Sequence, residues 1–189
     1  RWTFAEHDEY VYNRKSEVIV NGECPPHFFP LKKIEGKSLS ELELLEEDKF
    51  FALFSGKLIL EGKIESVVVK TAAQGLNSEG VKVVNKELFH EATILSNLKH
   101  DHIVRCHGVG TGLHAVSRGG FFIVVEQLNG GTLSQKIKDC KDTKSRKKFW
   151  YPFVDTLRIT AHIADALWYL RSGAYANYSV CHRDIKPAN

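Results

Sequence analysis

Short apolar runs separated by turn-forming residues dominate the first half of the chain, a pattern typical of neighbouring β-strands. The runs are LELL at 42–45, FFALFSGKLIL at 50–60 and IESVVVK at 64–70. They are rich in Leu, Val, Ile and Phe, which favour strands. The sequence EGK at 61–63 supplies a turn between the last two runs. We therefore predict three adjacent strands.

A helical period replaces the strand pattern at 84–100. Apolar residues recur every three or four positions and form one stripe, made of Leu88, Ala92, Leu95 and Leu98. Asn85 is a candidate N-cap for this helix. Glu91 falls on the apolar stripe, so we expect its carboxylate to point inward.

The chain then returns to strands before it becomes helical. HIVRCHGVG at 102–110 and GGFFIVVEQL at 119–128 read as strands, and the second is apolar enough for both faces to be buried. Glycines beside Asn129 mark a break and lead into a short helix. The segment 154–170 predicts a long helix with apolar residues around most of its surface. Five strands with one inserted helix, followed by a helical region, indicate an α+β fold.

The first 40 residues follow a different pattern of residue types. Aromatic residues alternate with charged ones and CPPHFFP interrupts them, which predicts irregular structure with one short strand at 16–20. We assign no function to this N-terminal extension. The chain accordingly divides into an extension at 1–40, a sheet region at 41–128 and a helical region at 129–189.

Composition excludes several classes of protein. The 189 residues are 43% hydrophobic and 26% charged, which is typical of a globular domain. The net charge is only +3, and the basic run KDTKSRKK at 141–148 is local, so we expect a solvated loop and no nucleic-acid partner. The sequence contains neither an apolar stretch of about 18 residues nor a signal-like start, and it indicates no membrane span. It indicates no particular oligomeric state.

The four cysteines favour an intracellular, cytoplasm-like compartment. They are widely spaced and form no CxxC pair, so neither a disulfide framework nor a zinc site is indicated. They are Cys24, Cys106, Cys140 and Cys181.

Two charged residues fall on faces that the patterns predict to be apolar. Strand alternation places Lys70 beside Val68 on one face, and Glu91 lies on the helical stripe. Because an unpaired buried charge is costly, we expect these two side chains to form an ion pair. From residue types alone, a purely structural pair or a snorkelling lysine is the simpler explanation.

The stretch HRDIKPAN at 182–189 instead favours a functional role for these charged residues. Asp184, Lys186 and Asn189 place a carboxylate, an ammonium and an amide in one short loop anchored by Pro187. Such groups can accept a proton, neutralise a phosphate and ligate a hard metal ion. The spacing H-R-D-x-x-x-x-N matches the protein-kinase catalytic loop at every fixed position, which disfavours an ordinary polar turn.

From about residue 42 to its last residue, the chain resembles a eukaryotic-type protein kinase. Besides the catalytic loop, VVVK at 67–70 resembles the V-A-I-K strand, and LKHDHIV at 98–104 resembles a segment that follows the helix of the small lobe. FIVVEQLNGGTL at 122–133 resembles the hinge. The resemblance implies a five-stranded antiparallel small lobe with one helix and an incomplete helical large lobe. It also implies ATP, Mg²⁺ and a protein substrate.

The resemblance assigns residues to the nucleotide. Lys70 would contact the α- and β-phosphates and pair with Glu91. Val125 would be the gatekeeper, and backbone groups of Glu126 and Leu128 would face the adenine edge. The residues implied around the nucleotide, besides Lys70, are Val68, Leu45, Leu53, Val125, Glu126 and Leu128.

The resemblance also assigns catalytic roles. Asp184 would orient the substrate hydroxyl and accept its proton, Lys186 would steady the γ-phosphate, and Asn189 would hold one Mg²⁺. A lysine two positions after the aspartate is the form found in serine/threonine kinases. His182 and Arg183 would have regulatory roles, since an arginine beside the aspartate resembles kinases that are switched by phosphorylation of the activation segment.

The glycine-rich loop of the family is replaced, and two registers are open. In one, three other residues stand at the glycine positions, namely Glu46, Asp48 and Phe51. We favour this register because it aligns SGKL at 55–58 with a family segment and keeps Phe50 at the loop tip and Leu53 at the usual valine. In the other, Gly56 is the third glycine, and Phe51 and Leu53 stand where the first two belong.

The missing glycines predict weak binding of ATP. Glycines let backbone N–H groups approach the phosphates, and in the favoured register Glu46 and Asp48 add negative charge there. Two functions stay open: a serine/threonine protein kinase with an atypical loop, and a pseudokinase that acts as a binding or scaffold module with weak or no nucleotide binding. A small-molecule kinase is disfavoured because its loop usually reads H-G-D.

The ends of the sequence suggest a piece of a longer kinase. The chain begins at Arg1, contains no methionine and stops at Asn189. We expect a D-F-G motif within roughly the next 15 to 40 residues of the natural chain. Residues 1–189 alone are then expected to lack kinase activity and to be only marginally stable, because the helix at 154–170 would lack cover.

Overall fold

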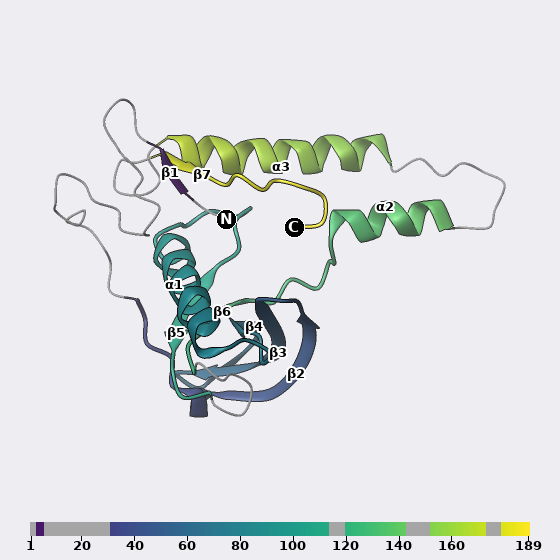
Figure 1. Cartoon of the computed structure of the whole chain (residues 1–189). Helices are drawn as coiled ribbons and strands as arrows, with labels where there is room; N and C mark the ends of the chain where they lie inside the picture. The colour runs from purple at the N-terminus through teal and green to yellow at the C-terminus, as the bar shows by residue number, and fades with distance from the viewer. Residues whose placement is uncertain (1–2, 6–30, 114–119, 143–151, 173–178) are drawn as a thin grey trace. The chain divides into compact units, whose positions relative to one another are not determined.

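The computed structural model describes residues 3–5, 31–113, 120–142, 152–172 and 179–189 (Figure 1). The chain forms two compact units. The sheet unit is His7–Gln127, and the helical unit consists of Arg1–Glu6 and Leu128–Asn189. The strand predicted at 16–20 lies outside the described residues.

A five-stranded antiparallel sheet forms the centre of the sheet unit, as predicted. The strand order is β2-β3-β4-β6-β5, and a short 3-10 helix, η1 (Gly36–Ser38), precedes the sheet. The strands are β2 (Leu39–Glu47), β3 (Phe51–Leu60), β4 (Lys63–Ala72), β5 (Cys106–Gly110) and β6 (Phe122–Glu126).

The turn between β3 and β4 contains two residues, Glu61 and Gly62. Their φ angles are 52° and 77°, and Leu60 pairs directly with Lys63. Left-handed φ at both central residues matches the right-handed twist of a β-hairpin, and glycine adopts this conformation without strain. The turn predicted at 61–63 is therefore confirmed, and it fixes the register of β4 against β3.

Apolar side chains pack on both faces of the sheet. One cluster contains residues from β2, β3, β4 and β6, with Phe122, Val67 and Val69 among its fully buried members. The second cluster joins the opposite face to α1 (Ser78–Leu95) through Val84, Leu88 and other residues of the helix. Burial on both faces of β6 agrees with its apolar sequence.

Helix α1 begins earlier than the sequence pattern indicated. Asn77 is the N-cap, and its Oδ1 accepts the N–H of Gly80 at 2.8 Å, so the predicted cap at Asn85 is wrong. Gly80 and the valines that follow it have low helix propensity, and the packing of Val84 in the core outweighs that preference. The predicted apolar stripe is confirmed, because all four of its residues are buried, namely Leu88, Ala92, Leu95 and Leu98.

Strand β5 is shorter than predicted because its first residues form a turn. His100 Nδ1 accepts the N–H of His102, and the His100 carbonyl accepts the N–H of Ile103, both at 3.1 Å. These backbone donors are thereby satisfied outside the strand ladder. The strand accordingly begins at Cys106 instead of residue 102.

The helical unit contains α2 (Leu133–Asp142), α3 (Phe153–Arg171) and a two-stranded antiparallel sheet. That sheet pairs β1 (Thr3–Ala5) with β7 (Ser179–Cys181). The predicted long helix is confirmed as α3, whereas three-residue strands are too short to give a periodic signal.

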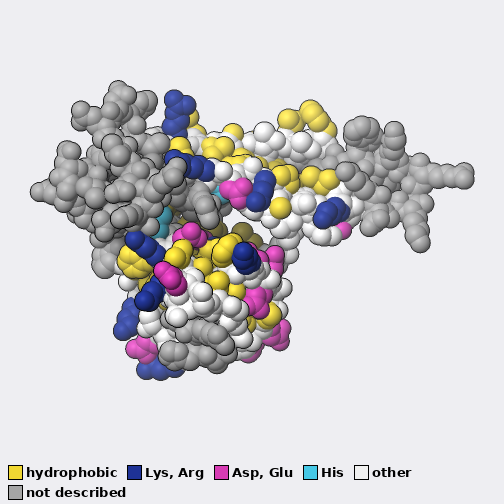
Figure 2. All heavy atoms as spheres, viewed as in Figure 1, with side chains coloured by type: hydrophobic (Ala, Val, Ile, Leu, Met, Phe, Trp, Pro, Cys, Tyr) yellow, Lys and Arg dark blue, Asp and Glu magenta, His cyan; other side chains and the backbone are white. Residues whose placement is uncertain are grey.

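Helix α3 exposes much of its apolar surface. Its buried residues are Ala166 and Leu170, while large apolar side chains such as Phe153 and Trp168 are exposed, and Figure 2 shows hydrophobic side chains along this helix. Among the described residues, no helix combines the length and the hydrophobicity that crossing a bilayer requires.

Candidate functional site

An ion pair connects β4 to α1 in the sheet unit. Nζ of Lys70 lies 2.7 Å from Oε2 of Glu91, as the sequence pattern predicted. The side chains are 24% and 26% exposed, so the pair is partly buried instead of fully buried. Part of each side chain therefore remains in contact with solvent.

The sheet face around Lys70 is apolar. Lys70 pairs directly with Leu53 on β3, while Val68 pairs with Val125 on β6. Directly paired residues of antiparallel strands point to the same face, and positions two apart along β4 also share a face. The structure therefore brings Leu53, Val68 and Val125 together beside Lys70, each of them half-buried.

The other residues assigned to the nucleotide lie elsewhere. Leu45 is 54% exposed, at an irregularity of β2 between the pairs that Leu44 and Glu46 make with β3. Glu126 is half-buried and bonds to Arg105 twice, through its backbone N–H and through its carboxylate. Leu128 is exposed and belongs to the helical unit.

The turn at the position of the glycine-rich loop is Asp48–Phe50, between β2 and β3. Gly56 lies within β3, where it pairs with Val67, so the location of the turn agrees with the favoured register. Oδ1 of Asp48 accepts the backbone N–H groups of Phe50 and Phe51, each at 2.7 Å. Sequence reasoning treated Asp48 only as a negative charge and missed these hydrogen bonds.

Phe51 contacts the lysine of the ion pair. Nζ of Lys70 lies 4.5 Å from the centre of the Phe51 ring, within the range of a cation–π interaction. The ring also packs against the core cluster that joins the sheet to α1. Sequence reasoning identified Phe51 as a replaced glycine but carried no signal for this contact, which depends on the pairing of β3 with β4.

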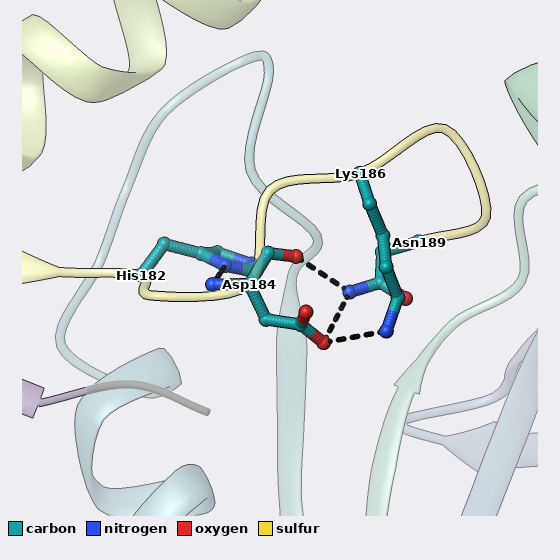
Figure 3. A network of polar contacts seen from close by, with 4 residues as sticks. All are labelled: His182, Asp184, Lys186 and Asn189. Atoms are coloured by element: carbon teal, nitrogen blue, oxygen red, sulfur yellow. Dashed lines mark hydrogen bonds and ion pairs between the residues drawn. The ribbon is translucent and has the colours of Figure 1, made fainter.

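In the helical unit, three side chains of the loop at 182–189 form one network (Figure 3). Nζ of Lys186 donates to Oδ2 of Asp184 at 2.9 Å, and Nδ2 of Asn189 donates to the same oxygen at 3.0 Å. Asn189 also donates to the Asp184 carbonyl at 2.7 Å. These bonds, that from Lys186 first and that from Asn189 second, lower the pKa of Asp184. An aspartate carboxylate is ordinarily ionised at neutral pH, and these bonds favour its ionised form further.

The backbone of this loop has one residue in a left-handed conformation and is held by two hydrogen bonds. Arg183 has a φ of 61°, a left-handed conformation that is uncommon for a residue other than glycine. The N–H of Asp184 donates to Nδ1 of His182 at 3.3 Å. The carbonyl of Pro187 accepts the N–H of Ser134 at 2.7 Å, which ties the loop to the start of α2. Sequence reasoning did not identify Ser134.

Asn189 has the chemistry expected of a ligand for a hard metal ion. Because its Nδ2 faces Asp184, the amide is oriented with Oδ1 as an acceptor oxygen, the ligand type that Mg²⁺ prefers. In the described part of the chain, no three or more His, Cys, Asp or Glu residues group together in a way that could hold a metal ion.

Comparison with known proteins identifies the family. The family model described as protein tyrosine and serine/threonine kinase matches residues 39–189. The chain is 29% identical over 167 residues to the probable L-type lectin-domain containing receptor kinase V.3 of Arabidopsis thaliana, covering 88% of this chain and 22% of that protein. It is 33% identical over 131 residues to the human serine/threonine-protein kinase Nek2, covering 68% and 26%. It is 30% identical over 146 residues to mitogen-activated protein kinase kinase kinase 5 of Arabidopsis thaliana, covering 71% and 18%.

The matched regions span between 18% and 26% of the length of these three relatives. The family match includes both the Lys70–Glu91 pair and the loop around Asp184. The five-stranded antiparallel sheet with its one helix is consistent with the small lobe of the protein-kinase fold. This chain belongs to the protein kinase family.

Proposed function

We propose that the protein transfers the γ-phosphate of ATP to serine or threonine hydroxyls of a protein substrate. The observation that carries this proposal is the Asp184 carboxylate, which is held by Lys186 and Asn189 through one oxygen and is kept ionised. A fixed, ionised carboxylate is suited to orient a hydroxyl and accept its proton. Lys186, two positions after the aspartate, supports serine or threonine as the acceptor, as does the likeness to a serine/threonine-protein kinase.

The reaction assigns a role to each charged side chain. The substrate oxygen forms a bond to the γ-phosphorus as the bond to the β,γ-bridging oxygen breaks, and ADP leaves. Asp184 accepts the hydroxyl proton, while Lys186 steadies the charge of the transferred group. Lys70, oriented by Glu91, contacts the α- and β-phosphates. In this chemistry the protein contributes mainly positioning and electrostatic stabilisation.

Asn189 would hold one Mg²⁺ through Oδ1. When bound, Mg²⁺ neutralises negative charge on the phosphate oxygens. The hydrogen bonds from Nδ2 to Asp184 keep Oδ1 directed away from the carboxylate, so this chain orients the ligand before the ion binds.

The adenine would lie against the apolar sheet face formed by Leu53, Val68 and Val125. By resemblance to the family, Leu45 and backbone groups of Glu126 and Leu128 would also contact the adenine. In this assignment, residues 41–128 form the small lobe and hinge, and 129–189 begin the large lobe. His182 and Arg183 would have regulatory roles, as in kinases that are switched by phosphorylation of the activation segment.

A second candidate function is that of a pseudokinase, a scaffold module with weak or no nucleotide binding. The turn at Asp48–Phe50 favours it, because Asp48 and Phe51 stand where the family usually has glycines. The two functions differ in whether phosphate is transferred, so an activity measurement separates them.

The test uses the full-length protein, radiolabelled ATP with Mg²⁺, and peptides in which serine, threonine or tyrosine is the sole acceptor. We expect label on serine and threonine peptides, and its loss in D184N. Label on tyrosine peptides alone would overturn the acceptor assignment. A folded wild-type protein that transfers phosphate to none of the peptides would favour the pseudokinase.

A further inference from the structure

In the turn between β2 and β3, backbone N–H groups that could bind a ligand are already hydrogen-bonded to a side chain of this protein. Protein kinases hold ATP phosphates with a flexible loop above them and a lysine on the neighbouring strand. Here the loop position is the turn Asp48–Phe50 and the lysine is Lys70. Both already have partners within the sheet unit.

The backbone donors of the turn bond to a carboxylate. Oδ1 of Asp48 accepts N–H groups from Phe50 and Phe51, and both distances are 2.7 Å, which is short and typical of charge-assisted bonds. One anionic oxygen on two consecutive amides is the arrangement that a phosphate oxygen adopts on such a turn. The side chain of Asp48 therefore occupies the donors that a phosphate would use.

The ammonium of Lys70 has two partners of its own. Glu91 lies 2.7 Å away, and the ring centre of Phe51 lies 4.5 Å away. Glycine at position 51 would leave the second side of the ammonium open. A phosphate that approaches Lys70 from that side must displace the ring.

Hydrogen bonds join this turn to the residues that follow β4, so the turn has an ordered conformation. The Phe50 carbonyl accepts the N–H of Ala73 at 2.9 Å, and Oε1 of Glu47 accepts the N–H of Gln74 at 2.9 Å. The N–H of Asp48 also donates to the Phe51 carbonyl at 2.9 Å. Displacing Asp48 or Phe51 therefore requires breaking an ordered turn.

We propose that Asp48 and Phe51 act as internal substitutes for nucleotide phosphates and set the specificity of the adenine site. In this state the phosphates of ATP add little to its affinity, and the protein binds adenosine about as tightly as ATP. The inference rests on the proposed nucleotide-binding function. It differs from simple charge repulsion because Asp48 acts through the hydrogen bonds that it accepts.

Calorimetric titration of the full-length protein with adenosine and with ATP and Mg²⁺ tests the proposal. D48A frees the two amides, and we expect about a tenfold gain in ATP affinity, since bonds to a charged group are worth about that much. D48N keeps a neutral oxygen in place to accept both N–H groups, so its gain in ATP affinity should be clearly smaller than that of D48A. F51A should raise ATP affinity about fivefold by uncovering Lys70.

Two controls keep the result interpretable. Phe89 is an exposed aromatic of α1 whose ring contacts Phe121, so F89A removes a comparable ring away from Lys70 and should leave the ratio of ATP to adenosine affinity as in the wild type. Adenosine affinity within about twofold of the wild type shows that a variant is folded.

The possible results distinguish a failure of this inference from a failure of the proposed nucleotide-binding function. A wild-type affinity for ATP about a hundredfold above that for adenosine would overturn the inference, as would unchanged ATP binding in D48A and F51A. A gain in D48N equal to that in D48A would assign the effect to charge and also overturn it. If no variant binds either ligand, the proposed nucleotide-binding function itself is wrong.

Discussion

Glu91 of α1 and Lys70 of β4 form an ion pair with an Nζ to Oε2 distance of 2.7 Å, and the two side chains remain about a quarter exposed. A pair with this exposure contributes about 1 kcal/mol or less to stability. Its main effect is to fix the position of the ammonium. We therefore expect E91A to lower phosphoryl transfer about a hundredfold while the melting temperature changes little.

An exposed ion pair of the same length provides the control. Lys37 and Glu35 are also 2.7 Å apart but lie at the surface, so E35A should leave activity and stability close to the wild type. Steady-state kinetics and thermal melts measure both effects. A large stability loss in E91A with a proportional loss of activity would instead make the pair a structural one.

The hydrogen bond from Lys186 to Asp184 predicts a shift in the pH dependence of activity. This bond is the main reason why the pKa of Asp184 is lowered. Its loss in K186A should raise the pKa, so the acidic limb of the pH–rate profile should move to higher pH. K186R retains a cationic donor and should keep the limb near its wild-type position. Identical limbs in K186A and the wild type would contradict the assignment of this limb to Asp184.

The lowered pKa values of two histidines in the sheet unit predict that the free energy of unfolding falls at acidic pH. Burial lowers the pKa of His90 and is the largest cause of the lowered pKa of His107, which the charge of Glu65 partly opposes. The folded state therefore favours neutral imidazole, whereas the unfolded chain takes up protons below about pH 6.5. The resulting stability is present above that pH and is lost as the pH falls toward the lowered values.

Urea unfolding followed across this pH range provides the measurement. H90Q and H107Q should each reduce the slope of unfolding free energy against pH below about pH 6.5. H162Q removes an exposed histidine of α3 and serves as the matched substitution. A slope that is equally steep in H90Q, H107Q and the wild type would refute the prediction.

Gly110 at the end of β5 should not tolerate a side chain. A Cβ at this position would meet the Ile34 carbonyl and the ring of Phe122, both of which are fully buried in the core. We expect G110A to lower the free energy of unfolding by about 1–3 kcal/mol, as overpacking commonly does. At Gly75 nothing lies within 4 Å of an added Cβ, so G75A should change stability by less than about 0.5 kcal/mol. Equal effects of the two substitutions would show that the β5 packing differs from that described.

Sequence reasoning succeeded where a periodic pattern or a fixed spacing repeats over many residues. The stripe that includes Leu88 and Ala92 located α1, and the alternation around Val68 placed Lys70 on the face that receives Glu91. The spacing from His182 to Asn189 located the loop that carries Asp184. These signals are local, and each is fixed by one element or one motif.

The remaining features depend on contacts between elements. The Phe51 ring reaches Lys70 only because β3 pairs with β4 in one register, and Ser134 reaches Pro187 only because α2 begins beside the loop. The cap at Asn77 was missed because low-propensity residues follow it and the core of the protein determines where the helix starts. No pattern within a single segment encodes such contacts.

The pairing of β1 with β7 has a practical consequence for protein production. The family match begins at residue 39, yet Thr3 pairs with Cys181, the residue directly before His182. An expression boundary chosen from the family match would delete β1 and leave an unpaired strand edge next to the loop at 182–189. Unpaired edges template aggregation, so boundaries that retain the first residues should yield more soluble protein.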